Sequence, residues 1–515
     1  MIQELQQQSE YELREYQIEA VESVLRMVED GVRNILVVMP TGTGKTVVFS
    51  EIAKEMFHRT GLPVMVIAHR DELIRQAVEK LEQFGCYVEV EKAEEYASND
   101  VDVVVASIQT LTRRADRRFR GDQFSMIIVD EAHHVLAASY QKVLSLFRGV
   151  PVLGVTATPD RSDKSNLGQF FDAVAYEYTI ADAVRDGFLC DIIAHQLPVE
   201  VDISKAATIG GDIAEDDAGE AVDCVTQAIA DHIAPFIKNE HKTLIFTPLV
   251  KNAISMSEAL KKNNVNAYWV SGDHPDRHDI VKSFRDGEIT TLVNAMLLTE
   301  GFDCPDISCI VPLRPTKSRS LYVQMIGRGT RITEGKERLL VLDPLWIAGK
   351  HRLCEPTVLL SGKPEVREKT RQLMYEKGES LFEAFKDATD SYLKHLQNSG
   401  TPKTFSLIDA ALILNDHGIV TYEPVLRWEK EPPTEKQIAF LQRNNIVVDP
   451  TMTRGHASRI ITTIMARHRA GMPTIRQISF LRRNGLPVPA TKAEASKLIE
   501  KKLAQFRMNG KGSEQ

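Results

Sequence analysis

The stretch NILVVMPTGTGKT, residues 34–46, joins an apolar strand directly to a loop rich in glycine and threonine. Because Gly42 and Gly44 leave the backbone flexible, consecutive amides of this loop can wrap a polyphosphate at the start of a helix. Lys45 would then neutralise the β and γ phosphates, and Thr46 would ligate Mg²⁺. An incidental lysine in a glycine–threonine turn is the alternative, but the preceding strand favours a phosphate site. The predicted ATP contacts are Pro40, Thr41, Gly42, Thr43, Gly44, Lys45 and Thr46.

Short apolar runs of the same kind recur along the chain, with helical stretches between them. Near-continuous apolar strands that alternate with helices predict parallel sheets covered on both faces. In the first half, the expected strands are residues 34–39, 64–68, 101–106, 126–130 and 152–156. In the second half, they are residues 243–247, 267–270, 291–295, 308–311 and 339–342. The sequence therefore predicts an α/β fold with two tandem parallel-sheet domains, whose ligands bind beyond the carboxyl ends of the strands.

The second chemical motif is DEAH, Asp130 to His133, which follows the expected strand 126–130. At the end of that strand, Asp130 can hold Mg²⁺ through water, and Glu131 can orient the attacking water. A solvated acidic turn is the alternative for any Asp–Glu pair. The buried strand and the phosphate loop favour the catalytic interpretation.

The third motif, QMIGRGTR, spans Gln324 to Arg331 in the second sheet domain. At a spacing of three residues, Arg328 and Arg331 would share one face of a helix. Their planar guanidinium groups suit the charge that develops on a γ-phosphate during transfer. A surface helix with two arginines is the commoner interpretation of such a pair taken alone. Here the motif predicts catalytic roles for Gln324, Arg328 and Arg331 across a cleft that ATP closes and hydrolysis opens.

These motifs and several weaker ones occur in the same order as in superfamily 2 helicases and translocases, which the region from about residue 13 to 345 resembles. The resemblance implies two RecA-like domains, with ATP and Mg²⁺ as cofactors. It also implies that LREYQ, residues 13–17, senses adenine through Arg14 and Gln17. The later segment NAMLLTEGFDCP, residues 294–305, would face ATP through Gly301 and Asp303.

Other segments resemble the coupling and nucleic-acid motifs of that superfamily. TATP, residues 156–159, is similar to the coupling motif. The resemblance implies coupling roles for Thr156 and Thr158 of this segment and for His133 of the DEAH motif. IAHRDELIRQ and ASIQTL are similar to the nucleic-acid motifs of the first domain, and Thr299 would touch phosphate from the second. The implied nucleic-acid contacts in the motor are Arg70, Gln109, Thr110 and Thr299.

The combination of LREYQ, AHRDELIRQ, TEGFDCP and QMIGRGTR is most similar to bacterial and phage DNA-repair helicases of the DEAH/DExH type. That branch includes RadD-like helicases and the motor subunits of restriction enzymes. DEAD-box RNA helicases differ, since they have DEAD and an HRIGRxGR-like last motif. RadD-like proteins carry cysteine-rich zinc segments after the motor, which this sequence lacks, so no zinc is expected.

The end of the sequence contains an internal repeat. TEKQIAFLQRNNI, residues 434–446, matches TIRQISFLRRNGL, residues 474–486, and TRGHASRII, residues 453–461, matches TKAEASKLI, residues 491–499. Capping boxes at three of the four segments predict two helical hairpins, in which the Phe–Leu pairs 440–441 and 480–481 mark the core.

This repeat is strongly basic. From Thr434 to Gln515 the net charge is 15 − 5 = +10, which leaves −8 − 10 = −18 for the rest of the chain. The repeat is therefore predicted to bind the phosphate backbone, although a solvated basic face is the alternative. The candidate contacts are Arg443, Arg459, Arg476, Arg482, Arg483, Lys497, Lys501 and Lys502.

The predicted organisation has six parts. They are an ATP-binding RecA-like domain (1–175), a linker with the start of the second lobe (176–240), a second RecA-like domain (241–345), a helical extension (346–430), the basic hairpin repeat (431–507) and a disordered tail (508–515). Within the linker, the acidic stretch 209–221 is expected to be an exposed loop or a partly ordered linker. The sequence contains no run of 18 apolar residues, so no membrane span is predicted. The N-terminus is too polar for a secretory signal, and the scattered cysteines favour a reducing cytoplasm, bacterial or phage-infected.

Four functions remain open on the sequence alone. The first is a DNA-dependent ATPase that unwinds or translocates along single-stranded, forked or branched DNA in repair, recombination or replication. The second is a translocase that remodels protein–DNA complexes without separating strands. The third is an adaptor motor that recruits a nuclease, replication or repair partner through its tail, and an RNA helicase is a further alternative.

Overall fold

The computed structural model describes residues 12–98, 100–157, 167–238, 242–295, 298, 302, 304–360, 364–397, 422, 424, 428–444, 446–448, 452–484 and 486–510. The chain forms two compact units. The first comprises Met1–Leu360 with Arg371–Glu383, and the second comprises Ser361–Thr370 with Ala384–Gln515. Both sheets belong to the first unit, and the helical repeat belongs to the second.

The first sheet has seven strands: β1 (Asn34–Val38), β2 (Val64–Ala68), β3 (Val88–Glu91), β4 (Val103–Ser107), β5 (Met126–Asp130), β6 (Val152–Thr156) and β7 (Ala173–Glu177). Their order is β3-β4-β2-β5-β6-β1-β7, and every pairing is parallel. The five strands expected in this half are confirmed, with small shifts at their ends. Strands β3 and β7 were not predicted; they extend the two edges of the sheet.

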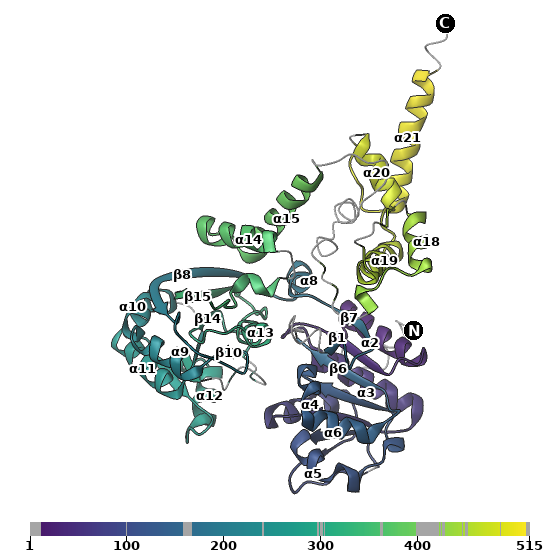
Figure 1. The fold of residues 1–515 in the computed structure, drawn as a ribbon. Helices are drawn as coiled ribbons and strands as arrows, with labels where there is room; N and C mark the ends of the chain where they lie inside the picture. The colour runs from purple at the N-terminus through teal and green to yellow at the C-terminus, as the bar shows by residue number, and fades with distance from the viewer. Residues whose placement is uncertain are drawn as a thin grey trace. The chain divides into compact units, whose positions relative to one another are not determined.

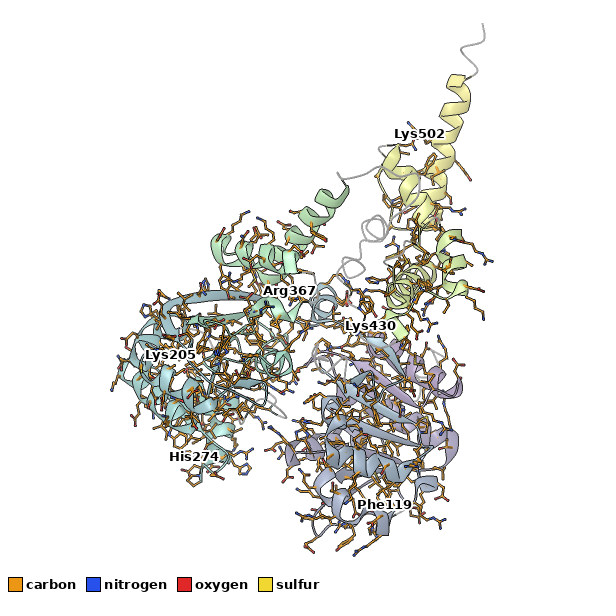
Figure 2. The ribbon with its side chains drawn as sticks, in the orientation of Figure 1. Phe119, Lys205, His274, Arg367, Lys430 and Lys502 are labelled. Carbon is orange, nitrogen blue, oxygen red and sulfur yellow. The ribbon has the colours of Figure 1, made fainter. Side chains whose placement is uncertain are left out.

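Helices surround the first sheet (Figure 1). They are α2 (Glu15–Glu29), α3 (Lys45–Thr60), α4 (Asp71–Gln83), α5 (Ile108–Arg118) and α6 (Ala138–Leu144), with 3₁₀ turns at Gly121–Gln123, Ala132–Leu136 and Ser145–Phe147. Helix α8 (Ile180–Arg185) follows β7. Alternate strand residues such as Leu36, Met65 and Ile127 share one core with apolar residues of α5 and α6, as the twofold period of a strand requires. Phe119, labelled in Figure 2, belongs to this core and packs edge-on against Phe124.

The second sheet has six strands: β8 (Asp191–Asp202), β11 (Thr243–Thr247), β12 (Ala267–Val270), β13 (Thr291–Ala295), β14 (Cys309–Pro312) and β15 (Arg338–Ile347). Their order is β12-β13-β11-β14-β15-β8, again with every pairing parallel. The accompanying helices are α9 (Glu215–Asp223), α10 (Thr226–Ile237), α11 (Val250–Lys262), α12 (Arg277–Arg285) and α13 (Arg319–Gly327). The five strands expected in this half are confirmed, and two tandem RecA-like sheets are therefore present.

Two expectations about the second sheet are wrong. The acidic stretch 209–221 is ordered: β9 (Thr208–Ile209) pairs with β10 (Asp212–Ile213), and α9 follows. Its carboxylates hold it in place, because Asp212 accepts hydrogen bonds from the Thr316 hydroxyl and the Lys317 amide. The sheet also continues past residue 345, the predicted end of this domain, since β15 pairs with the long strand β8 as far as Ile347.

In the described residues, the remaining helices are α14 (Pro364–Lys377), α15 (Leu381–Gln397), α18 (Glu435–Arg443), α19 (Arg454–Arg469), α20 (Ile475–Arg483) and α21 (Lys492–Gly510), with 3₁₀ turns at Pro356–Leu359 and Trp428–Lys430. The two predicted hairpins are confirmed as α18–α19 and α20–α21. Leu441 and Leu481 are fully buried, as expected of core positions. Helix α21 takes in the start of the segment 508–515 expected to be disordered, and residues 511–515 lie outside the described residues.

The repeat in the sequence is matched by a repeat of hydrogen bonds. Gln437 donates to the Ser458 hydroxyl at 2.8 Å, and the equivalent Gln477 donates to Ser496 at 2.9 Å. Each bond ties the first helix of a hairpin to the second. Among the helices that the structure describes, none has the length and apolar character needed to cross a membrane.

Candidate active site

The phosphate loop lies at the carboxyl end of β1, where α3 begins at Lys45. Gly42 and Gly44 have φ angles of 88° and 83°, a left-handed conformation that favours glycine. Thr43 donates its hydroxyl to the Pro40 carbonyl at 2.7 Å and closes the turn. The loop therefore presents its backbone amides at a helix N-terminus, as a polyphosphate site requires.

Arg14 and Gln17, the predicted adenine sensors, lie beside this loop at the start of α2. Gln17 is buried, and its amide nitrogen donates to the Thr43 carbonyl at 3.0 Å while its amide oxygen accepts from the Arg14 backbone. Tyr16, which the sequence did not single out, also donates to the Thr43 carbonyl, at 2.8 Å. The Tyr16 ring stacks on Tyr178 with centroids 4.4 Å apart. Tyr16 thus holds the phosphate loop from helix α2, and its ring packs on Tyr178.

Asp130 and Glu131 lie at the carboxyl end of β5, and both are buried. Glu131 has a φ of 52°, and its Oε1 lies 3.2 Å from Lys45 Nζ. Burial alone would raise the pKa of Glu131, but Lys45 and His133 outweigh it and hold that pKa well below its usual range. Burial, followed by the charge of Glu131, raises the pKa of Asp130 to about 6. A divalent cation beside Asp130 would offset both effects, so these residues fit the predicted magnesium role.

The arginines of the second sheet domain reach the same site, although not from one helix face. Helix α13 ends at Gly327, so the prediction that Arg328 and Arg331 share a helical face is wrong. Arg331 instead lies in an extended segment that forms an isolated bridge with Leu189. Arg328 donates to the Phe302 carbonyl at 2.8 Å, and burial lowers the pKa of Arg331.

Glycine is needed at Gly42 for close packing as well as conformation. A Cβ atom there would lie 2.9 Å from Cγ of Arg331 and 3.2 Å from Cδ2 of Leu189. At Gly327, a Cβ would lie 3.0 Å from Cβ of Thr41. The second sheet domain thus packs directly on the phosphate loop of the first.

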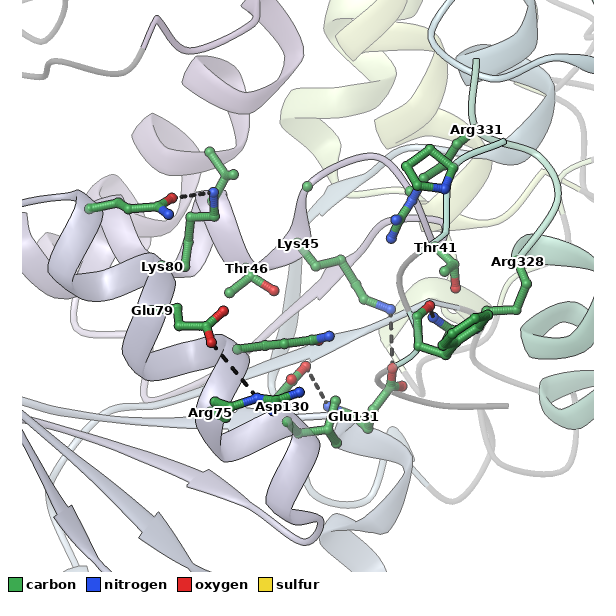
Figure 3. Close-up of a pocket in the computed structure, with 18 of the residues that line it drawn as sticks. Thr41, Lys45, Thr46, Arg75, Glu79, Lys80, Asp130, Glu131, Arg328 and Arg331 are labelled. Carbon is green, nitrogen blue, oxygen red and sulfur yellow. Dashed lines mark hydrogen bonds and ion pairs between the residues drawn. The ribbon is translucent and has the colours of Figure 1, made fainter. Parts of the chain in front are cut away.

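These residues surround one cavity of about 770 Å³, a volume suited to a nucleotide (Figure 3). Figure 3 shows Lys45 turned toward Glu131, with Arg328 and Arg331 approaching from the other domain. Lysine, hydroxyl, carboxylate and guanidinium groups form a donor set suited to a triphosphate with Mg²⁺. Of the predicted ATP-site residues, the cavity is lined by Thr41, Gly42, Gly44, Lys45, Thr46, Asp130, Glu131, Arg328 and Arg331.

One wall of this cavity was missed by the sequence analysis. It is the polar face of α4, which presents Arg75, Gln76, Glu79, Lys80 and Gln83. Arg75 and Glu79 lie four residues apart, and their charged groups are 3.7 Å from each other. The sequence signal that could have predicted this wall is the helical spacing of polar residues from the end of the segment 67–76 onward.

Some predicted site residues are placed elsewhere or not described. Gln324 is buried in α13 and is not one of the described residues that line the cavity. Thr156 is fully buried at the end of β6, and its carbonyl accepts from the Met39 amide at 2.9 Å. Residues outside the described parts of the chain are Thr158, Thr299, Gly301 and Asp303.

A row of imidazole rings connects the site to the first nucleic-acid motif. His133 Nδ1 lies 3.4 Å from Oε2 of Glu131, and its ring is 4.0 Å from that of His134. His134 in turn lies 4.2 Å from the ring of His69, the residue before Arg70. This row places His133 between Glu131 and the segment that holds Arg70, and its coupling role stays a prediction.

The predicted nucleic-acid residues of the first domain gather at one edge of its sheet. Gln109 donates to the His69 carbonyl at 2.9 Å, which joins the segments after β2 and β4. The Thr110 hydroxyl accepts from the Ala93 amide at 3.0 Å. Arg70 lines a second cavity of about 600 Å³, to which Arg277 and Lys282 of the other domain also contribute.

In the second unit, Arg443 and Arg476 are brought together. Arg476 donates to the Arg443 carbonyl at 2.6 Å and so joins the two hairpins, while the Arg443 side chain is exposed. Arg482 and Arg483 lie near the end of α20, and their side chains fall outside the described parts of the chain.

Comparison with known proteins assigns both halves of the site to known families. A model described as the type III restriction enzyme res subunit matches residues 10–161, which hold Lys45 and Glu131. A model described as the helicase conserved C-terminal domain matches residues 222–333, which hold Arg328 and Arg331.

Individual relatives agree with this assignment. The chain is 32% identical over 371 residues to IRC3 of Saccharomyces cerevisiae, which carries the name of an ATP-dependent helicase; the match covers 67% of this chain and 53% of that protein. It is 25% identical over 374 residues to the type I restriction enzyme EcoAI endonuclease subunit of Escherichia coli, covering 64% and 46%. The chain thus spans about half the length of these curated relatives.

A solved structure shows the same likeness. A fragment assigned to the HsdR subunit of a type I restriction enzyme from Vibrio vulnificus matches with a TM-score of 0.54 and 26% identity, covering 65% of each chain. Together with the two parallel sheets and the cavity between them, these matches show that the chain belongs to superfamily 2 of the helicases and is related to restriction-enzyme motor subunits.

Proposed function

We propose that this protein hydrolyses ATP to drive its own movement along DNA. One observation carries the proposal: Lys45 and Glu131 of one sheet domain and Arg328 and Arg331 of the other line a single cavity. A site divided in this way is complete only when the two domains are together. Binding and hydrolysis of ATP would therefore change the relation between the domains, which is the elementary step of a motor.

Different residues of the chain have different roles in ATP hydrolysis. The amides of the phosphate loop and Lys45 hold the triphosphate, and Thr46 with Asp130 would hold Mg²⁺, which neutralises phosphate charge when bound. Glu131 orients the attacking water. Arg328 and Arg331 meet the charge that develops during transfer.

DNA is proposed as the track because relatives of the chain are subunits of restriction enzymes. Arg70, Gln109 and Thr110 would contact it in the first domain, and Thr299 in the second. The basic hairpin repeat would add contacts through Arg443, Arg482 and Arg483, with Arg476 positioned between the hairpins. Repair, recombination or replication of DNA is the setting that we propose for this motor.

ATPase assays with no nucleic acid, single-stranded DNA, forked DNA and RNA test the proposal. We expect DNA to stimulate hydrolysis, and we expect Lys45→Ala to lower turnover by about 10²–10³-fold. Lys205→Ala, at an exposed lysine outside the cavity lining, is the matched control and should leave turnover unchanged. Stimulation by RNA alone would reject the DNA track, and normal activity of Lys45→Ala would reject the site.

Displacement of a labelled strand then separates unwinding from translocation. Release of a strand from a forked duplex supports unwinding. Displacement of a third strand from a triplex, with no release from the fork, supports translocation alone.

A further inference from the structure

A buried carboxylate anchors the loop that follows β3. Glu91, the last residue of that strand, is fully buried. Its carboxylate accepts from Arg114 Nε at 2.6 Å, Arg118 Nη2 at 3.5 Å and the Ala97 amide at 2.9 Å. Because a charge buried in this way must be paired, these bonds fix both ends of the loop to helix α5.

Arg114 and Arg118 of α5 also donate hydrogen bonds to backbone carbonyl groups of this loop. Arg114 donates to the carbonyls of Ala93 and Glu95, each at 2.7 Å. Arg118 donates to the Ala97 carbonyl at 2.6 Å. The guanidinium groups are thus committed to holding the loop in one shape.

This rigid loop displays a tyrosine. Tyr96 is 60% exposed, so its ring is accessible from solvent. The guanidinium carbon of Arg114 lies 4.1 Å from the centre of its ring, and that of Arg118 lies 5.4 Å away. Arginine stacking orients the ring in advance, so little further conformational freedom would be lost on binding.

The loop is bonded to both nucleic-acid segments of the first domain. Lys92 Nζ lies 3.0 Å from a carboxylate oxygen of Asp71, directly after Arg70. The Ala93 amide donates to the Thr110 hydroxyl. Strands β2, β3 and β4 are parallel neighbours, so the three segments that follow them lie along one edge of the sheet.

We propose that Tyr96 stacks on a base of the strand that the motor holds, an inference that rests on the proposed nucleic-acid function. The neighbouring residues Glu94 and Glu95 are exposed, and their carboxylates would repel phosphate. A flat aromatic surface beside them suits the neutral face of a base. Phosphate groups would instead meet Arg70.

Binding of single-stranded DNA to three variants tests the inference. Tyr96→Ala and Tyr96→Leu should each weaken binding about tenfold, since a base stacked on an aromatic side chain contributes on this order. Leucine still covers the Arg114 guanidinium but cannot stack on a base. Tyr96→Phe should bind like the unmodified protein.

Two further measurements separate stacking from other causes. An oligonucleotide with a run of abasic sites should bind the unmodified protein and Tyr96→Ala equally, because it offers no base to stack. The slope of log affinity against log salt should stay unchanged in Tyr96→Ala, since a neutral side chain releases no counterions. Thermal unfolding of each variant checks that it remains folded.

Tyr87→Ala is the matched control. Tyr87 is 58% exposed and precedes β3 at the opposite end of that strand, so its replacement should leave DNA binding unchanged. Equal affinities of Tyr96→Ala and Tyr87→Ala, or full affinity of Tyr96→Leu, would overturn the stacking role while DNA-stimulated hydrolysis stands. Absence of DNA binding by the unmodified protein would overturn the proposed function as well.

Discussion

The Nζ atom of Lys45 lies 3.2 Å from Oε1 of Glu131, and both side chains are largely buried. The lysine that is predicted to hold phosphate and the glutamate that is predicted to orient water are therefore paired with each other. A triphosphate must compete with Glu131 for the ammonium group. This exchange would release the carboxylate at the moment when its water-orienting role begins.

Replacing Glu131 by glutamine tests this exchange. We expect Glu131→Gln to lower turnover by about 10²–10³-fold, because the amide orients water poorly. ATP should bind several-fold more tightly, since a neutral side chain competes less for Lys45. Titration with a fluorescent ATP analogue and phosphate release measure the two effects. Glu79→Gln, at a second cavity carboxylate, should alter turnover far less, and an equal loss there would contradict the assignment.

The close approach of Gly42 and Arg331 gives a second prediction. Gly42→Ala should lower ATP turnover about 10²-fold, because its Cβ displaces Arg331 in addition to straining a left-handed backbone. Gly31→Ala is the matched control: its φ of 80° imposes the same strain, but no atom lies within 4 Å of the new Cβ. The left-handed conformation alone should cost each variant about 1–2 kcal/mol of stability. Equal turnover in the two variants would mean that strain alone matters.

The phosphate loop and the DEAH motif could be predicted because each depends on local sequence. An apolar strand followed by Gly42, Gly44 and Lys45 defines its geometry within a few residues. The arrangement of Arg328 and Arg331 could not be predicted in the same way. Their extended segment is fixed by a bridge to Leu189, far away in the sequence.

The same distinction explains the missed edge strands and loops. Strand β3 reads VEVE, in which the buried Glu91 looks like a surface residue until Arg114 and Arg118 are placed beside it. Strand β8 contains His195 and Pro198 and lacks a continuous apolar run. Strand β8 is stabilised by its pairing with β15, and this pairing cannot be predicted from the local sequence of either strand.

The row of imidazole rings predicts an effect on coupling. His134→Ala removes the ring between His133 and His69, so DNA should stimulate ATP hydrolysis several-fold less. The comparison is between rates measured with and without single-stranded DNA. His58→Ala, at an exposed histidine near the end of α3, should retain full stimulation. Unchanged stimulation in His134→Ala would show that coupling follows another route.

The basic repeat predicts a change in salt dependence. Replacing the exposed Arg443, Lys497 and Lys501 by glutamine should make the slope of log affinity against log salt less steep, by about 0.7–0.9 for each phosphate that is no longer neutralised. The same three-residue change at exposed Arg59, Lys205 and Lys261 of the first unit is the control. Binding at several salt concentrations measures both. Identical slopes would assign the repeat a role other than DNA binding.

Asp343 predicts how stability depends on pH. Burial raises the pKa of this carboxyl to about 7, although a hydrogen bond from Trp346 partly opposes the shift. Between about pH 4 and pH 7 the folded chain therefore binds a proton that the unfolded chain has released. Folding stability must fall as pH rises through this window. Above pH 7 the full cost, roughly 2–4 kcal/mol, is present.

Asp343→Asn removes the titrating group and keeps an oxygen that can accept from Trp346. We expect the variant to unfold at a higher temperature than the unmodified protein at pH 8, with a difference that shrinks steadily toward pH 5. Asp202→Asn is the control, because Asp202 is exposed and the Ser204 hydrogen bonds lower its pKa, so it stays ionised throughout this range. A difference that is constant from pH 5 to pH 8 would show that Asp343 is already ionised in the folded protein.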